Sequence, residues 1–222
     1  MSAPVTALVS SAFLTSALVT GVGTAVMLIG EVRKSFLLRA LGKVVAVAGF
    51  LSAALTNGFP EHHVGVVTLV ALILCALGDL LLLPNGAKRA FLLGLFAFLL
   101  GHVGFLLAFV TAGVAWWACA LALLALVPVT VFVLRWLLPH VKAPMKVPVL
   151  LYVTAISLMV ASAVGSVAGG GPVLGLIAAV AFFLSDLAVA RERFVTDSVV
   201  NKLWGLPLYF GAQLMFAAWM LR

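Results

Sequence analysis

Two carboxylates inside otherwise apolar segments are the residues of this sequence best suited to do chemistry. Asp79 lies in the segment CALGDLLLL and Asp186 in AFFLSDLAVARERF. An ionised carboxyl group costs several kcal/mol or more in hydrocarbon, so an acid at membrane depth usually has a function. Each acid lies about five residues before the predicted end of its helix, roughly 7 Å inside, so the two can face each other. Such a pair can keep one carboxyl protonated and the other ionised.

Further polar side chains are predicted at membrane depth, and any of them could either join this chemistry or only bind a neighbouring helix. Tyr209 and Gln213 are four residues apart and share a helical face. Lys43 lies about eight residues into its predicted helix, roughly 12 Å deep. It can extend its amine toward the lipid headgroups, or pair with an acid in an ion pair without catalytic function. The complete set is Lys43, His102, Tyr152, Ser157, Tyr209 and Gln213.

A metal or cofactor site is not expected from these residues. His102 is predicted about 20 Å along its helix from the basic side, too far from the two acids to share a metal ion with them. The sequence has no glycine-rich phosphate loop, HExxH or GxSxG motif. Its two cysteines, Cys75 and Cys119, have neither metal-site nor disulfide spacing and are interpreted as small packing residues.

The composition requires a membrane to hold these groups. Of 222 residues, 65% are hydrophobic and 9% charged, with a mean hydropathy of +1.32. A soluble domain carries about a quarter charged residues, so the sequence predicts an all-α, polytopic transmembrane helical bundle. The net charge of +7 lies in short loops, and we therefore expect no nucleic-acid partner. The bacterial inner (plasma) membrane is the expected location.

Eight helices are predicted in one transmembrane domain, residues 1–222. Their ranges are about 5–30, 35–56, 63–83, 89–110, 114–138, 147–168, 172–190 and 200–221. The third and seventh contain the similar segments ALGDL and FLSDL, each followed by a Phe and another helix. This similarity favours a distant duplication of a four-helix unit.

Basic residues alternate between the connections. Of the 13 Lys and Arg, 11 lie at the first, third, fifth and seventh connections: Arg33, Lys34, Arg39, Lys88, Arg89, Arg135, Lys142, Lys146, Arg191, Arg193 and Lys202. The intervening connections have none. By the positive-inside rule the basic side is cytoplasmic, and both termini are predicted on the non-cytoplasmic side.

These residues together resemble the lysoplasmalogenase (YhhN-like) family of integral membrane hydrolases. The similar elements are Lys43, the Gly78-Asp79 step, FLLGLFAFLLGHVGF from Phe91 to Phe105, Tyr152, the Ser185-Asp186 step, Phe194, and Tyr209 with Gln213. They extend over most of the chain. Phe105 is a departure, because the family often has Tyr there.

The resemblance implies hydrolysis of the vinyl-ether bond of a lysoplasmalogen, giving a fatty aldehyde and glycerophosphoethanolamine or glycerophosphocholine. Asp79 and Asp186 would be the catalytic acid and base, in an order that the sequence does not decide. Lys43, His102, Tyr152, Tyr209 and Gln213 would contact the substrate, and Lys43 or a basic loop would hold its phosphate. The expected partners are this lysophospholipid and the bilayer. The oligomeric state is left open.

Two other functions fit the same residues. A proton-coupled small-molecule transporter or channel also uses intramembrane acids with Tyr and Gln. A structural membrane subunit could use Lys43 only to neutralise an acid. The shallow predicted depth of the acids favours the hydrolase, because a transport site is expected near the bilayer midplane.

Overall fold

The computed structural model describes residues 11–83 and 88–220, and this part of the chain forms eight α-helices. Their bounds are α1 Ser11–Val32, α2 Phe36–Thr56, α3 His63–Leu81, α4 Lys88–Ala112, α5 Trp116–Leu137, α6 Ala143–Ala168, α7 Val173–Ala190 and α8 Val199–Ala218. Three short helical turns join them: η1 Phe59–Glu61, η2 Leu138–His140 and η3 Arg191–Val195.

The predicted all-α class and the count of eight helices are confirmed, and two boundaries need correction. Helix α6 begins at Ala143, four residues before the prediction, because a proline in the first helical turn is tolerated and Pro144 does not end the helix. Helix α7 continues beyond Ala190 as the π-helical turn η3. Residues 5–10 of the first predicted helix and residue 221 of the last lie outside the described residues.

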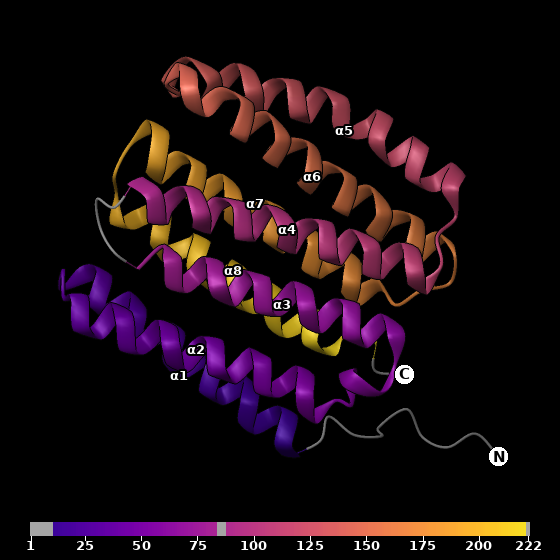
Figure 1. Cartoon of the computed structure of the whole chain (residues 1–222), viewed down its shortest axis with the longest axis horizontal. Helices are drawn as coiled ribbons and strands as arrows, with labels where there is room; N and C mark the ends of the chain where they lie inside the picture. Colours follow the sequence, from indigo (N-terminus) through magenta and orange to yellow (C-terminus); the bar gives the residue numbers. More distant parts are fainter. Residues whose placement is uncertain (1–10, 84–87, 221–222) are drawn as a thin grey trace.

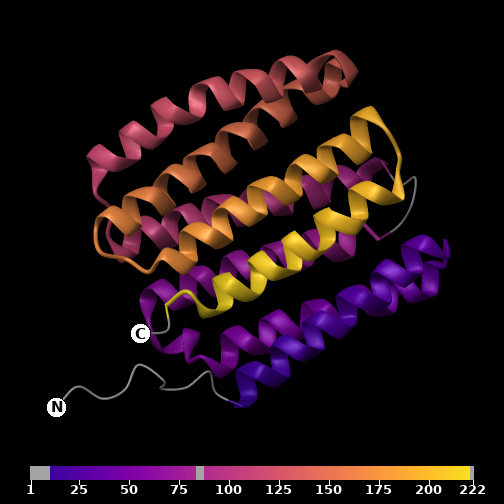
Figure 2. The same ribbon diagram turned by 180° about the vertical axis from the view of Figure 1, so that it is seen from behind.

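The helices form antiparallel hairpins stacked side by side (Figure 1). The pairs α1–α2, α3–α4, α5–α6 and α7–α8 are in contact, and α8 also contacts α1, α2 and α3. Helices α3 and α4 lie in front of α8 and α7 in Figure 1 and behind them in Figure 2. Residues from the two halves of the chain therefore meet between these two pairs.

Small residues bring α1 and α2 unusually close. A Cβ atom on Gly42 would collide with the backbone of Met27, and one on Gly23 would collide with the backbone of Ala46. Lipid tails are as apolar as leucine, so helices in a membrane associate by close packing of this kind. The tight hairpin fixes the position of Lys43, the residue that follows Gly42.

Aromatic rings fill the bundle toward the end opposite the basic loops. Phe105 and Phe216 stack with their centroids 3.8 Å apart, and Phe109 packs on both Phe216 and Trp219. All four side chains are buried. The ring of Phe105, at the position where the resemblance calls for Tyr, is thus a packing element of this aromatic layer.

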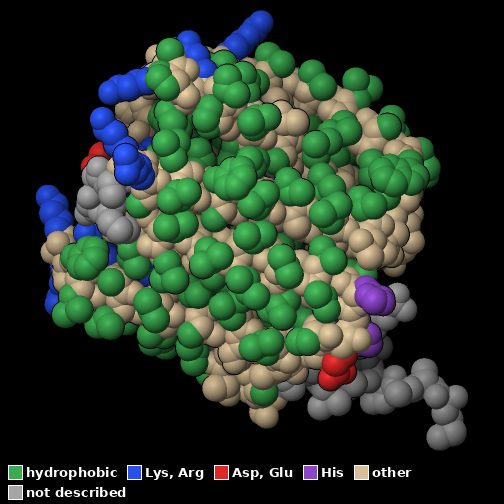
Figure 3. All heavy atoms as spheres, viewed as in Figure 1, with side chains coloured by type: hydrophobic (Ala, Val, Ile, Leu, Met, Phe, Trp, Pro, Cys, Tyr) green, Lys and Arg blue, Asp and Glu red, His purple; other side chains and the backbone are tan. Residues whose placement is uncertain are grey.

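The outer surface has the composition of a membrane protein. Hydrophobic side chains cover most of the face in Figure 3, and the Lys and Arg side chains gather along its left side. Seven of the described helices, α1 to α7, are long and apolar enough to span a bilayer. Helix α8 is 20 residues long but is not among them, and it contains the buried polar residues Asn201, Tyr209 and Gln213.

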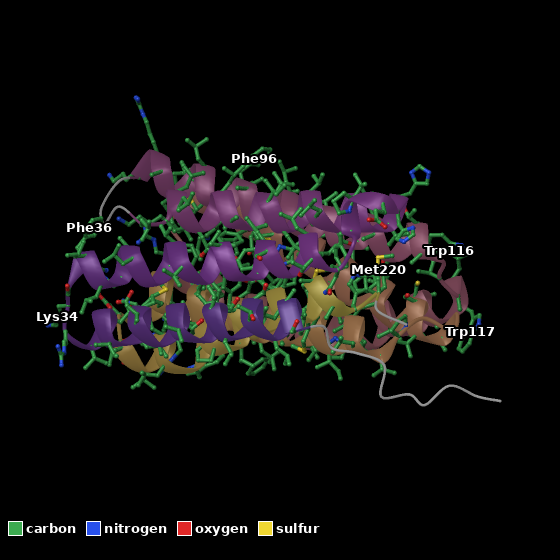
Figure 4. The ribbon with its side chains drawn as sticks, turned by 90° about the horizontal axis from the view of Figure 1, so that it is seen from below. Lys34, Phe36, Phe96, Trp116, Trp117 and Met220 are labelled. Carbon is green, nitrogen blue, oxygen red and sulfur yellow. The ribbon has the colours of Figure 1, made fainter. Side chains whose placement is uncertain are left out.

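The labelled residues of Figure 4 identify the two ends of the bundle. Figure 4 places Lys34 at one end, and Trp116, Trp117 and Met220 at the other. Helix α1 ends beside Lys34, so it begins at the tryptophan end, where α8 also finishes. Tryptophan is enriched where a membrane meets water. Which end faces the cytoplasm stays a prediction.

Candidate active site

A cavity of about 600 Å³ opens between the helices at the basic end of the bundle. Its volume falls within the roughly 300–1,000 Å³ typical of small-molecule sites. Both predicted acids, Asp79 and Asp186, line it, together with Lys43, Tyr152 and Tyr209. Apolar side chains from α4, α5 and α6 form one side of the cavity.

The Asp79 site consists of Asp79 on α3, Lys43 on α2 and Tyr209 on α8. The Lys43 Nζ atom lies 3.1 Å from Asp79 Oδ1 and also donates to the Asp79 backbone oxygen at 3.2 Å. The Tyr209 hydroxyl donates to Asp79 Oδ2 at 2.5 Å. Lys43 is therefore a buried cation paired with an acid, and both oxygens of that acid are engaged.

The residue before Asp79 explains how α3 approaches its neighbour. A Cβ atom on Gly78 would lie 2.7 Å from the ring of Phe98 on α4, so only glycine leaves room for this ring. Phe98 in turn packs edge-on against Tyr209, with centroids 5.8 Å apart. Gly78 thus leaves room for Phe98, and Phe98 packs against the Tyr209 ring whose hydroxyl binds Asp79.

The Asp186 site consists of Asp186 on α7, His102 on α4 and Tyr152 on α6. The Tyr152 hydroxyl donates to Asp186 Oδ2 at 3.2 Å, and His102 Nε2 lies 3.1 Å from the same oxygen. Asp186 Oδ1 has no hydrogen-bond partner among the described residues. The Asp186 side chain keeps 15% of its exposure and the Asp79 side chain 5%, so Asp186 is the more open to the cavity.

The predicted separation of His102 from the acids is wrong. Asp186 is nine residues from the end of η3, because the helical path continues to Val195, so Asp186 lies deeper than a helix ending at residue 190 implied. The 3.1 Å distance between His102 Nε2 and Asp186 Oδ2 shows that the two side chains meet. Among the described residues, no group of three or more His, Cys, Asp or Glu side chains is arranged to hold a metal ion.

The His102–Asp186 contact has a geometry in which the two side chains can share one proton. His102 Nδ1 lies 2.7 Å from the carbonyl oxygen of Phe98, which can only accept, so Nδ1 carries a hydrogen. Nε2 and Oδ2 would repel each other at 3.1 Å if neither carried a proton. The pair is therefore either imidazolium with carboxylate or imidazole with carboxylic acid. Nε2 is at ion-pair distance but is not aligned for a hydrogen bond.

The two sites share a wall but no direct hydrogen bond among the described residues. The ring of Phe182 stacks on His102 with centroids 4.3 Å apart and packs against Tyr209 at 5.5 Å. Each acid takes one partner from the other half of the chain: Asp79 binds Tyr209 of α8, and Asp186 contacts His102 of α4.

Gln213 and His102 do not line the cavity, although both were expected to contact substrate. Gln213 is fully buried one turn beyond Tyr209, and its amide atoms have no hydrogen-bond partner among the described side chains other than the nearby Cys75 thiol, a weak one. Ser157 bonds Val153 and Thr130, which is the helix-binding alternative.

A charged rim that the sequence analysis missed surrounds the mouth of the cavity. Lys202 Nζ lies 3.0 Å from Glu31 and 3.1 Å from Glu192, bridging α1 and η3. Asp197 is exposed, and a hydrogen bond with Glu192, together with repulsion from its charge, raises the pKa of the Asp197 carboxyl. Arg193 stacks over the ring of Phe91. The only sequence signal for these contacts was the dense run of charges in ARERF.

Comparison with known proteins gives one match. The YhhN family model matches residues 38–220, which include α2 from its first turn and every later helix. Neither the curated proteins nor the solved structures contain a match to the chain. All seven predicted site residues lie within the matched range. The chain is therefore a member of the YhhN family.

Proposed function

We propose that this protein hydrolyses the vinyl-ether bond of lysoplasmalogens, releasing a fatty aldehyde and a glycerophosphodiester. The observation that carries the proposal is that two acids with different partners, Asp79 buried and Asp186 partly buried, line one cavity at the end of a membrane bundle. A single-chain lipid can place its tail among the apolar cavity residues and its headgroup at the charged rim. The vinyl ether, beside the glycerol, then lies at the level of the acids.

The chemistry needs a proton donor and an anion. Vinyl ethers hydrolyse by proton transfer to the β-carbon, which leaves an oxocarbenium cation. Asp186 with His102 supplies this proton, because the two side chains can share one proton and Asp186 has an oxygen open to the cavity. Asp79 stays anionic beside Lys43 and stabilises the cation, as carboxylates do in glycoside hydrolysis.

Water then completes the reaction. An ionised carboxylate has about four lone-pair sites, so Asp79 can accept a proton from the attacking water despite its bonds to Lys43 and Tyr209. The product is a hemiacetal. When it collapses, the glycerol oxygen takes the proton from Asp79 and the hemiacetal hydroxyl returns one to the Asp186 site. Both acids are thereby restored and one water is consumed.

Packing in the rest of the bundle supports a hydrolase over a transporter. The buried rings of Phe105, Phe109, Phe216 and Trp219 occupy the bundle beyond the acids. A transport pathway would have to cross this aromatic layer. The cavity, by contrast, is reached from the basic end.

The direct test is aldehyde release from lysoplasmenylethanolamine by protein purified in mild detergent. Wild-type protein is expected to release aldehyde, and Asp79→Asn and Asp186→Asn to abolish it. Glu61→Gln, a carboxylate-to-amide change at the opposite end of the bundle, serves as the matched control. Folded wild-type protein that releases no aldehyde at any pH would defeat the proposal. Solute-driven proton uptake into sealed vesicles would then favour transport.

A further inference from the structure

Arg193 differs from the other cations that line the cavity. Lys43 is paired with Asp79, and Lys202 with Glu31 and Glu192. Arg39 lies 3.9 Å from Glu31. Arg193 has no carboxylate within ion-pair distance among the described residues, and its guanidinium lies over the Phe91 ring, whose centroid is 3.9 Å from Cζ.

Phe91 holds the guanidinium without using its hydrogen-bond donors. Stacking covers one flat face of the group, while the N–H groups around its edge remain available. The Phe91 ring is itself supported edge-on by Phe194, with centroids 6.5 Å apart. This platform joins the start of α4 to η3. A planar, charged fork held in this way matches the oxygens of a phosphate group.

The position of Arg193 relative to Asp186 matches the length of a glycerol backbone. Arg193 follows Asp186 by seven residues, roughly 10 Å along the helical path, and both residues line the cavity. The chain from a vinyl-ether carbon through glycerol to phosphorus has the bonds of two peptide units, roughly 7 Å when extended. A charge-assisted hydrogen bond of about 2.8 Å spans the remainder.

We propose that Arg193, held on Phe91, binds the phosphate of a lysophospholipid headgroup and so places the bond beside glycerol at the two acids. The proposal rests on the proposed function and names the part of the site that selects a phospholipid. Of the two expected phosphate ligands, Lys43 and a basic loop, it selects the basic loop, because Asp79 already occupies the Lys43 amine. The single chain is accepted by apolar residues that also line the cavity, among them Leu95, Val133, Val149 and Ile156.

Kinetics with two substrates test the role of the phosphate. Arg193→Gln is expected to raise the KM for lysoplasmenylethanolamine about 10- to 100-fold, the effect of losing a charge-assisted hydrogen bond. Hydrolysis of a 1-alkenylglycerol with the same chain and no phosphate should be unchanged. Arg193→Lys should recover part of the affinity. Arg135→Gln, an exposed basic residue outside the cavity, is the control. An equal loss on both substrates would overturn the proposal.

A binding measurement separates this inference from the hydrolase assignment. Lysophosphatidylethanolamine, whose ester-linked chain lacks the vinyl ether, should raise the thermal midpoint of wild-type protein more than that of Arg193→Gln. The matching monoacylglycerol should stabilise both proteins equally. This result supports the headgroup site even if no aldehyde is released. The same Arg193-dependent shift with inorganic phosphate alone, at equal concentration, would overturn it in favour of a small-anion site.

Discussion

The Asp79 site and the Asp186 site are built on the same plan and differ in the partner of each acid. His102 follows Asp79 by 23 residues, and Tyr209 follows Asp186 by 23 residues. In the structure these two side chains are exchanged, so that each contacts the acid of the other half. Lys43 precedes Asp79 by 36 residues and Tyr152 precedes Asp186 by 34. This matched spacing supports the interpretation of a duplicated four-helix unit.

The difference between the sites lies in charge. Asp79 has a lysine and a phenol on separate oxygens, and both contacts favour its ionised form. Asp186 has a phenol and an imidazole on one oxygen and leaves the other open. Two acids at matched positions in the two halves can thus differ in role because their partner residues differ. In the proposed mechanism, Asp186 with His102 donates the first proton, whereas Asp79 stabilises the cation and then accepts a proton from water.

Removing the imidazole is expected to have the largest effect. His102→Gln should lower kcat about 10²- to 10⁴-fold, the usual contribution of a positioned proton-transfer group. Aldehyde release and thermal unfolding of the same preparation measure activity and folding separately. If His102→Gln keeps full activity, the proton shared by His102 and Asp186 has no part in catalysis.

Removing the Lys43 amine should lower the free energy of unfolding. Lys43→Met leaves Asp79 buried without its cation, and the loss of an ion-pair partner costs about 3–5 kcal/mol of unfolding free energy. Adding Asp79→Leu to Lys43→Met should restore most of this stability but not activity. Asp186→Asn should cost far less stability than Lys43→Met in the same unfolding assay. Equal costs would remove the distinction between the two sites.

The two phenols provide a matched pair of smaller changes. Each donates one hydrogen bond to a carboxylate, which is worth about 1.5–3 kcal/mol. Tyr209→Phe should lower mainly the thermal midpoint, because the Tyr209 hydroxyl stabilises the buried Asp79 carboxylate. Tyr152→Phe should lower mainly kcat. The reverse pattern would exchange the assigned roles of Asp79 and Asp186.

The smallest effect is expected at the rim. Lys202 bridges two carboxylates but its side chain keeps 29% of its exposure, so Lys202→Met should cost about 1 kcal/mol or less. High salt should reduce the difference between wild-type protein and this variant, because ions screen exposed charges. A loss as large as that of Lys43→Met would place Lys202 among the residues that hold the fold together.

The sequence predicted the helices and the polar set but not the pairing within that set. Apolar runs and charged loops suffice for eight helices, because a bilayer fixes their length. The exchange of Tyr209 and His102 depends on how α8 and α4 pack across the halves. No sequence pattern indicated the π-helical turn that extends α7 beyond Ala190 and changes the depth of Asp186. Arg193 and Phe91 are far apart in sequence, and only the fold brings them into contact.

The composition of α8 bears on how the protein is made. Helices α1 to α7 are apolar enough to enter a bilayer individually, whereas α8 contains Asn201, Lys202, Tyr209 and Gln213. Its insertion therefore depends on helices already present, and α1, α2, α3 and α7 all contact it. Because α8 is translated after them, Tyr209 is the last of the predicted site residues that line the cavity to be made. During biosynthesis the candidate site is thus completed only after the surrounding helices have been made.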